Sequence, residues 1–281
     1  MLGSAVYGVL KDKYSLVLAV RDIEKVKLIE SAFGGTAKHR VVKFDAVDLY
    51  KEFMEKKAHP SEAWQKFVAE VGDVDYAINA LGVTIPFAMK NEALTLFVNG
   101  ALPHILAREF GQKLIHITTD CAFSGKTGYP YDESSPKTPT DVYGLSKSLG
   151  EPETCLTLRT SIIGRELAGH TGLLDWFLGQ SGKQLTGYTQ HFWNGITTKE
   201  FGKICDKIMS EPGAYPTSGL YHVFTTPVSK YEMLLAFSKK FNVKCDIKPD
   251  DGPKLNRVLS TVKDLNAKLQ IPSFEEMISQ M

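Results

Sequence analysis

Five short apolar runs alternate with helical segments over the first 160 residues of this 281-residue chain. Between the runs, apolar residues recur at the spacing of an amphipathic helix. Strands that alternate with helices in this way form parallel βαβ units. The pattern therefore predicts an α/β fold built on a doubly wound parallel sheet. The predicted strands are residues 15–20, 41–44, 76–80, 113–118 and 155–159.

After residue 160 the alternation is lost. Residues 190–198 are predicted to form a loop, followed by a helix over 199–209 and one further strand over 220–224. Two more helices are predicted, over 231–241 and 262–269. We expect a smaller C-terminal lobe, partly interleaved with the first, that closes over the site.

Polar residues follow the ends of the predicted strands. Right-handed crossovers place a ligand beyond the carboxyl ends of parallel strands. We therefore expect a binding site where these strand ends meet. The residues at or just past such ends are Arg21, Asp45, Gly82, Thr118 and Arg159.

Residues 113–151 combine a strand-end hydroxyl with a phenol and an ammonium. Thr119 comes directly after the fourth predicted strand, and Tyr143 and Lys147 follow four residues apart on one face of a predicted helix. Such a set can deliver a proton to a substrate oxygen. A second pair with this spacing, Tyr7 and Lys11, lies away from any strand-end hydroxyl, and we assign it no role.

Composition excludes several classes of protein. A formal net charge of +1 argues against a nucleic-acid binder. No apolar run approaches the roughly 18 residues of a membrane span, and the four cysteines form no CxxC pair. The seven histidines lack metal-ligand spacing. We therefore expect a cytoplasmic protein with no membrane partner and no catalytic metal, and the sequence permits a homodimer.

Four segments carry a family resemblance: 79–84 (NALGVT), 118–123 (TTDCAF), 142–151 (VYGLSKSLGE) and 194–198 (NGITT). In this order they resemble the dTDP-4-dehydrorhamnose reductase-like branch of the extended short-chain dehydrogenases, over nearly the whole chain. The resemblance implies a Rossmann-like dinucleotide-binding domain over residues 1–160, which also takes in about 188–225. Residues 161–281 would then form mainly a substrate-binding lobe.

The beginning of the chain departs from this family. Residues 1–10 have a helical apolar stripe, and Leu2 and Gly3 resemble the tail of the glycine-rich GxxGxxG loop. The strand and the two glycines that should precede them are missing. We expect that the chain starts at an internal methionine. The alternative is a real truncation, which would remove the central strand and weaken cofactor binding.

The resemblance and the strand ends together predict a cofactor site for NADP, with NAD as the alternative. Arg21 would accept the 2′-phosphate of NADP, although Asp22 follows it directly. Asp45 would face the adenine or else cap the next helix, and Asn99 would be the family's structural asparagine or a surface residue. The predicted cofactor residues are Leu2, Gly3, Arg21, Asp45, Ala46, Ala80, Leu81, Gly82, Asn99, Thr118, Tyr143 and Lys147.

In the predicted reaction Tyr143 protonates the developing alkoxide while the Lys147 ammonium lowers the pKa of Tyr143. Thr119 positions the same oxygen, and the resemblance implies that Lys147 also holds the nicotinamide ribose. Cys121 stands where related dehydratases carry a second carboxylate, which disfavours dehydration. The predicted substrate residues are Thr84, Asp120, Cys121, Arg159, Trp193 and Arg257, with His191 and Asn256 as further candidates; Trp193 could instead belong to the core.

These expectations combine into an NAD(P)H-dependent reductase of a 4-keto nucleotide-deoxysugar, in the synthesis of surface-polysaccharide sugars. Two alternatives remain open. One is a nucleotide-sugar epimerase. The other is a non-catalytic NADP-binding regulatory protein of the same fold, similar to the regulatory subunit of methionine adenosyltransferase.

Overall fold

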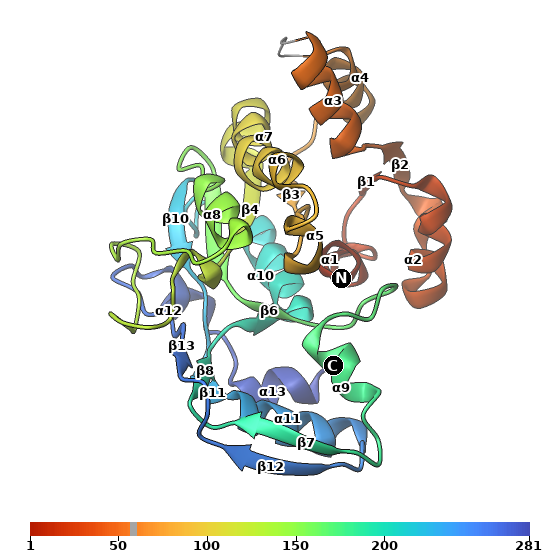
Figure 1. Ribbon diagram of the computed structural model, residues 1–281. Coiled ribbons are helices and arrows are strands. Elements are labelled where there is room, and N and C mark those ends of the chain that lie inside the picture. Colours follow the sequence, from red (N-terminus) through yellow and green to blue (C-terminus); the bar gives the residue numbers. More distant parts are fainter. Residues whose placement is uncertain (57–60) are drawn as a thin grey trace.

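A four-stranded parallel sheet forms the centre of the molecule, which is described by a computed structural model for residues 1–56 and 61–281 (Figure 1). The strand order is β10-β5-β4-β3, and all three neighbouring pairs are parallel. This confirms the predicted α/β class with a parallel sheet. The strands are β3 (Ala77–Asn79), β4 (Leu114–Thr119), β5 (Leu156–Thr160) and β10 (Gly219–His222).

The first two strands form a separate sheet. β1 (Val17–Val20) and β2 (Arg40–Lys43) pair in parallel with each other, and neither is hydrogen-bonded to β3. In Figure 1 this pair lies beside the four-stranded sheet, with α1 (Leu2–Leu10) below the space between them. The parallel sheet therefore consists of two pieces.

Helices cover both faces of the four-stranded sheet, so its two central strands, β4 and β5, are buried at every position. On one face α1 packs against α10 (Thr198–Ser210), and their apolar side chains meet those of β4 and β5. On the other face α7 (Leu102–Phe110) and the preceding π-helix η3 (Leu96–Ala101) join a second core with α4 (Glu62–Val71). Thus α10 and β10, which come late in the sequence, pack with the first lobe.

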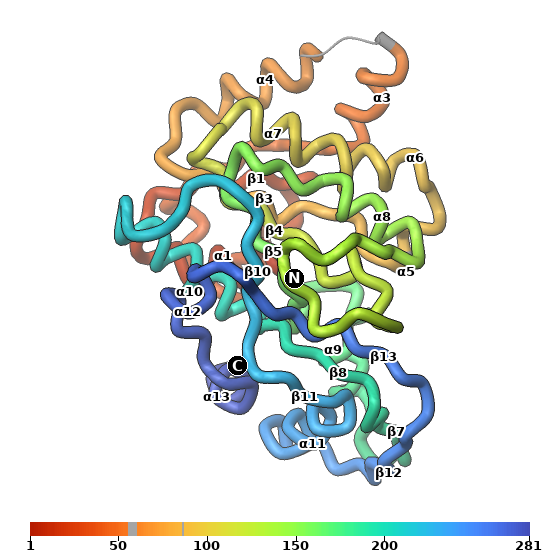
Figure 2. The backbone as a smooth tube through the Cα atoms, turned by 90° about the vertical axis from the view of Figure 1, so that its left-hand side faces the viewer, coloured from red at the N-terminus to blue at the C-terminus, as the bar shows by residue number. Residues whose placement is uncertain are grey.

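The lower lobe contains three small sheets around an aromatic core. The sheets are β7 (Gln184–Tyr188) with β12 (Asp246–Asp250), the order β11-β8-β13, and β6 with β9. Figure 2 shows α11 (Lys230–Phe241), β7 and β12 gathered at the bottom of the molecule. The predicted loop over 190–198 instead contains two short strands, β8 (His191–Trp193) and β9 (Ile196–Thr197). The boundary near residue 160 between a dinucleotide-binding and a substrate-binding unit stays a prediction.

The remaining elements complete the chain. The helix predicted over 262–269 begins later, as α12 (Leu265–Leu269). A break expected near Pro60, within a helical region from 47 to 71, lies outside the described residues. The other bounds are η1 (Ile23–Lys25), α2 (Val26–Phe33), η2 (Thr36–Lys38), α3 (Ala46–Lys56), α5 (Ile85–Ala88), α6 (Glu92–Thr95), η4 (Gly111–Lys113), η5 (Asp120–Ala122), α8 (Val142–Leu149), β6 (Ile162–Ile163), α9 (Leu173–Leu178), β11 (Val228–Ser229), β13 (Leu255–Asn256) and α13 (Phe274–Ser279).

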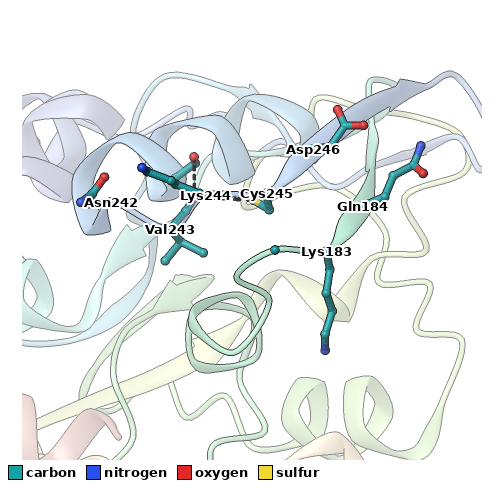
Figure 3. A pocket seen from close by; sticks show the side chains of 9 residues that line it. Lys183, Gln184, Asn242, Val243, Lys244, Cys245 and Asp246 are labelled. Atoms are coloured by element: carbon teal, nitrogen blue, oxygen red, sulfur yellow. Dashed lines mark hydrogen bonds between the residues drawn. The ribbon is translucent and has the colours of Figure 1, made fainter.

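An open pocket of ≈ 690 Å³ lies at the far end of the lower lobe. Its lining comes from the start of β7 and from the turn that joins α11 to β12, and Figure 3 shows these side chains, among them Lys183 and Asp246. None of the predicted site residues lines it. Within residues 1–56 and 61–281, no helix combines the length and the apolar character that crossing a bilayer requires.

Candidate active site

Strand β4 delivers the hydroxyl of Thr119 to the carboxyl edge of the sheet. All six residues of β4 are buried between β3 and β5. Where the strand ends, Thr119 Oγ1 accepts a hydrogen bond from the backbone N–H of Cys121 at 3.2 Å. The same hydroxyl lies 3.2 Å from Asp120 Oδ1, to which it donates. The turn η5 therefore fixes the orientation of Thr119.

Helix α8 is held very close to its neighbours, which fixes Tyr143 and Lys147. Asp141 caps the helix by accepting a hydrogen bond from Gly144 N at 2.7 Å. A Cβ atom at Gly144 would lie 2.3 Å from the carbonyl oxygen of Cys121, and one at Gly150 would lie 1.9 Å from that of Asn99. Side chains at these two positions would push the helix away from η5 and η3.

Lys147 is buried beneath the site. Its Nζ donates a hydrogen bond to the carbonyl oxygen of Ile117 on β4, at 2.8 Å. Burial lowers the pKa of Lys147 to about 8, although the nearby Glu151 carboxylate acts in the opposite direction. The ammonium is thus anchored to the strand that carries Thr119.

Tyr143 retains its proton strongly. Burial raises the pKa of its phenol well above the ordinary value, and Cys121 and Asp120 add to this shift. The neighbouring Thr119 hydroxyl acts in the opposite direction. The net shift is therefore upward rather than toward neutral pH, because burial disfavours the phenolate more strongly than the nearby groups favour it. The expected effect of Lys147 on the phenol stays a prediction.

Arg159 does not reach the site, contrary to expectation. It is fully buried, and its Nε and Nη2 donate to the two carboxylate oxygens of Glu151 at 3.0 and 2.6 Å. Its Nη1 lies 2.8 Å from His222 Nε2, and its guanidinium lies 5.0 Å from the centroid of the Phe123 ring. Such a paired and stacked guanidinium has no exposed donor for a substrate phosphate. Glu151 also accepts a hydrogen bond from Thr118, so this network supports β4 from behind.

Asn99 holds the loop after β3 against α8. Its side chain accepts a hydrogen bond from Val83 N at 2.8 Å and donates to Val83 O at 2.9 Å. It also donates to Ser146 Oγ at 3.2 Å. Both amide protons have protein partners, so Asn99 is a structural residue and the expected cofactor contact is not supported. Its position in a π-helix fits the frequent occurrence of such segments near functional sites.

The remaining predicted cofactor residues lie at two places along the strand ends. The first place is the end of β3. There the first turn of α1 lies next to Ala80, and a Cβ atom at Gly3 would lie 3.6 Å from the Cβ of Ala80. At the β1–β2 pair, Arg21 is exposed, and Asp45 accepts a hydrogen bond from Val47 N at 2.9 Å and so begins α3 as a cap. Leu2 and Ala46 are buried, Leu81 is half-buried and Gly82 is exposed.

Among the predicted substrate residues, the structure brings together Asp120, Cys121 and Arg257. Arg257 donates from Nε to the carbonyl oxygen of Phe123 at 2.9 Å, and its Nη1 lies 3.4 Å from Cys121 Sγ. Thr84 is exposed in front of α5. Asn256 uses its side-chain oxygen to accept a hydrogen bond from Val258 N, and His191 stacks on Tyr188.

Trp193 is a core residue. It is 5% exposed and packs edge-to-face on Phe274, with the ring centroids 5.8 Å apart. This corrects the expectation that its ring stacks on a substrate base, because the ring is enclosed by the core of the lower lobe.

The sequence analysis missed Lys230, the first residue of α11. It follows Ser229 of β11, which pairs with Phe192 of β8, and Phe192 pairs in turn with Asn256 of β13, the residue before Arg257. The Lys230 ammonium also interacts electrostatically with Asp120, Cys121 and Arg257. The only signal in the sequence is a lysine at the first position of a helix, where the helix dipole disfavours a positive charge.

Comparisons with known proteins place these residues in a family. The model of the RmlD substrate binding domain matches residues 88–258, which include Thr119, Tyr143 and Lys147. The spore coat polysaccharide biosynthesis protein SpsK of Bacillus subtilis is 30% identical over 184 residues, covering 62% of this chain and 63% of SpsK. A dTDP-4-dehydrorhamnose reductase of Mycobacterium tuberculosis is 33% identical over 106 residues, covering 35% of each chain. The chain thus aligns with less than two thirds of the length of these curated relatives.

Solved structures share the fold. The dTDP-4-dehydrorhamnose reductase of Bacillus anthracis in complex with NADP has a TM-score of 0.64 at 17% identity, covering 95% of this chain and 97% of its own. The UDP-N-acetylglucosamine 4-epimerase of Methanobrevibacter ruminantium in complex with UDP-N-acetylmuramic acid has a TM-score of 0.70 at 14% identity, covering 100% and 93%. Because the family model matches more than half of the residues, including the strand-end threonine and the Tyr–Lys helix, the chain belongs to the RmlD substrate binding domain family.

Proposed function

We propose that this protein is an NAD(P)H-dependent reductase of a 4-keto nucleotide-deoxysugar. The observation that carries the proposal is the fixed placement of Thr119 at the end of β4 beside the protonated phenol of Tyr143, with Lys147 anchored behind them. Relatives in the family include proteins named as dTDP-4-dehydrorhamnose reductase and dTDP-4-keto-6-deoxy-D-glucose reductase. A nucleotide sugar is therefore the substrate class that we propose.

The chain's residues fit a nicotinamide dinucleotide. No side chain caps the N-terminus of α1, so its first amide groups are available to a pyrophosphate beside Ala80. The exposed Arg21 at the end of β1 suits a 2′-phosphate, which favours NADP over NAD. Tyr143 and Lys147 would hold the nicotinamide end. When bound, the reduced cofactor supplies the hydride for carbonyl reduction.

The protein's part in the reaction is to position the carbonyl and to provide a proton. Because burial raises the pKa of Tyr143, its phenol stays protonated at neutral pH and can donate its proton to a developing alkoxide. Thr119, oriented by the Cys121 amide, would supply a second hydrogen bond to the same oxygen by turning its hydroxyl proton from Asp120 to the substrate. The buried ammonium of Lys147 stabilises the phenolate left after proton transfer.

Cys121 favours reduction over dehydration. Burial raises the pKa of this thiol to about 12, so it remains neutral and is a poor acid or base at neutral pH. Asp120 is then the one carboxylate next to Thr119 in the η5 turn. Elimination of water needs an acid and a base, whereas carbonyl reduction needs only the tyrosine proton and a hydride.

The Tyr143→Phe variant tests this function directly. Loss of the phenolic proton should reduce the turnover of dTDP-4-keto-6-deoxyglucose by at least 10²-fold while NADPH binding stays unchanged. Tyr7→Phe is the matched control, since Tyr7 stands in the second Tyr–Lys pair and only donates to Gly34 O at 2.7 Å. Turnover is measured by the loss of NADPH absorbance. Wild-type turnover in Tyr143→Phe would refute the proposal. Turnover without net NADPH oxidation would identify an epimerase instead.

A non-catalytic NADP-binding protein is the second candidate. It is favoured by the division of the parallel sheet, because β1 and β3 are not hydrogen-bonded neighbours at the edge where the cofactor would bind. Calorimetric titration with NADPH and NADH separates the two candidates. NADPH binding without turnover of any tested 4-keto nucleotide sugar would favour the regulatory role.

Location and assembly are part of the same proposal. A nucleotide sugar and a reduced dinucleotide are both available in the cytoplasm, where we place the protein. A homodimer is compatible with the fold, and size-exclusion chromatography with light scattering would measure the oligomeric state.

A further inference from the structure

Lys230 occupies a position that is unfavourable for an ammonium. It is the first residue of α11, whose N-terminus is capped by Ser229 and closed by a capping box with Glu232. The positive end of the helix dipole disfavours a cation there. Within residues 1–56 and 61–281, the Lys230 ammonium forms no ion pair or hydrogen bond that offsets this cost. The position of this cation is therefore not explained by the stability of the fold.

The surroundings of the ammonium are those of a binding site. Protein atoms surround Nζ, yet part of the residue remains exposed to solvent. Burial lowers the pKa of Lys230 to about 8, while Asp120 and Cys121 act to raise it and Arg257 to lower it. The indole ring of Trp193 lies on one side, with Nζ 6.0 Å from its centroid. Trp193 thus supports the lysine from the core.

Positive charge exceeds negative charge around Lys230. Arg257 is fastened through Nε to Phe123 O and through Nη1 to Cys121 Sγ, and its Nη2 has no partner in the described part of the chain. His191 is neutral, because burial together with Lys230 and Arg257 lowers its pKa to about 4. Asp120, the carboxylate with which Lys230 interacts, forms no ion pair with it among the described residues. Burial raises the pKa of Asp120, although Arg257 and Lys230 act to lower it.

We propose that Lys230, with Arg257 beside it, binds an oxyanion of the substrate and selects substrates that carry one. The proposal rests on the reductase site, since Lys230 interacts electrostatically with Asp120 and Cys121, and these two residues are hydrogen-bonded to Thr119. The oxyanion could belong to the diphosphate of the nucleotide or to a carboxylate on the sugar. Both groups accept charge-assisted hydrogen bonds from an ammonium and a guanidinium fork.

Calorimetric binding to Lys230→Met, without NADPH and without turnover, tests this inference. The probes are thymidine against dTDP, which differ by the diphosphate, and UDP-glucose against UDP-glucuronate, which differ by a carboxylate. A charge-assisted contact corresponds to roughly a tenfold to hundredfold loss of affinity. Lys230→Arg should retain most of the affinity. Lys239→Met removes an exposed lysine of the same helix and should change nothing.

The probes distinguish the source of the oxyanion. Weaker binding of dTDP with unchanged thymidine binding would assign the diphosphate, and weaker binding of UDP-glucuronate alone would assign a sugar carboxylate. Equal affinities of wild type and Lys230→Met for all four probes would overturn the inference. So would a wild type that binds none of the three probes that carry a diphosphate. Binding that depends on Lys230 in a protein without turnover would leave it standing while the reductase function fails.

Discussion

At the scale of single residues, Tyr143 and Lys147 have surroundings that disfavour charge on both. Burial raises the pKa of the phenol and lowers that of the ammonium. The pair therefore starts with a proton on Tyr143 and with a lysine whose charge is lost just above neutral pH. A proton donor that holds its proton until a substrate oxygen becomes basic suits reduction better than oxidation.

The pKa of Lys147 leads to a prediction about stability and pH. Between its folded pKa of about 8 and an unfolded pKa of about 10.4, the unfolded chain binds the extra proton. Stability should therefore rise with pH, by up to about 1.4 kcal/mol per unit from this residue. Lys147→Met should remove this contribution. Urea unfolding at pH 8 and pH 9 measures it.

Buried thiols act in the opposite direction near pH 9, but they are present in both proteins, so the contribution of Lys147 is the difference in slope between wild type and Lys147→Met. Burial raises the pKa of Cys205, so above about pH 9 the folded state holds the extra proton and loses stability. Lys239→Met, at an exposed position, is the control and should keep the wild-type pH dependence. An unchanged slope in Lys147→Met would mean that the ammonium is not desolvated.

At the scale of elements, the position of α8 depends on a close approach of two backbones. Gly150 ends α8 with φ −90°, a conformation open to any residue, yet a Cβ there would meet the Asn99 carbonyl oxygen at 1.9 Å. Gly150→Ala should therefore destabilise the fold by at least about 2 kcal/mol, through overpacking rather than backbone strain. The free energy of unfolding in urea measures this cost.

Gly179 provides a matched control for Gly150. It ends α9 with φ −84°, and the nearest atom to an added Cβ is the Trp176 carbonyl oxygen at an ordinary 3.5 Å. Gly179→Ala should change stability by less than about 0.5 kcal/mol. Equal costs at both glycines would show that the contact between α8 and η3 relaxes easily.

Sequence patterns predicted the elements whose burial is strong and regular. Strands β4 and β5 are buried at every position because both faces are covered, and α10 carries a full amphipathic stripe. Strand β12 (DIKPD) could not be found in this way, since it has three charged residues and a proline. It is a strand because it pairs with β7 across more than fifty residues of sequence, and proline is tolerated at such an edge.

Sequence patterns predicted the site residues whose positions follow from nearby sequence. They did not predict those whose positions depend on contacts with residues far away in the chain. Thr119, Tyr143 and Lys147 follow from a strand end and a helical spacing, so their placement needed little tertiary information. Arg159 also lies near the end of a strand, but its hydrogen bonds to Glu151 hold its side chain in the core. Lys230 lies more than a hundred residues from Thr119, and only the packing of the lower lobe brings it to the same place.

At the scale of the whole molecule, the division of the sheet predicts uneven local stability. The β1–β2 pair forms a two-stranded sheet apart from the four-stranded one, and the helices that follow β1 contain no buried residue. The β4–β5 pair lies between two hydrophobic cores. Regions with few buried contacts open locally, at a lower free energy than global unfolding.

Hydrogen exchange followed by mass spectrometry should reveal two classes of amide. Peptides from β1 and α2 should exchange through local opening, several kcal/mol more easily than peptides from β4 and β5. NADPH should slow exchange at β1 and β2, because Arg21 and Asp45 at their ends are proposed to contact it and binding stabilises the closed form. Uniform protection across both sheets without ligand would contradict the first expectation. If NADPH slowed exchange at β4 alone, the cofactor would not extend over β1. Arg21 would then not be the residue that distinguishes NADP from NAD.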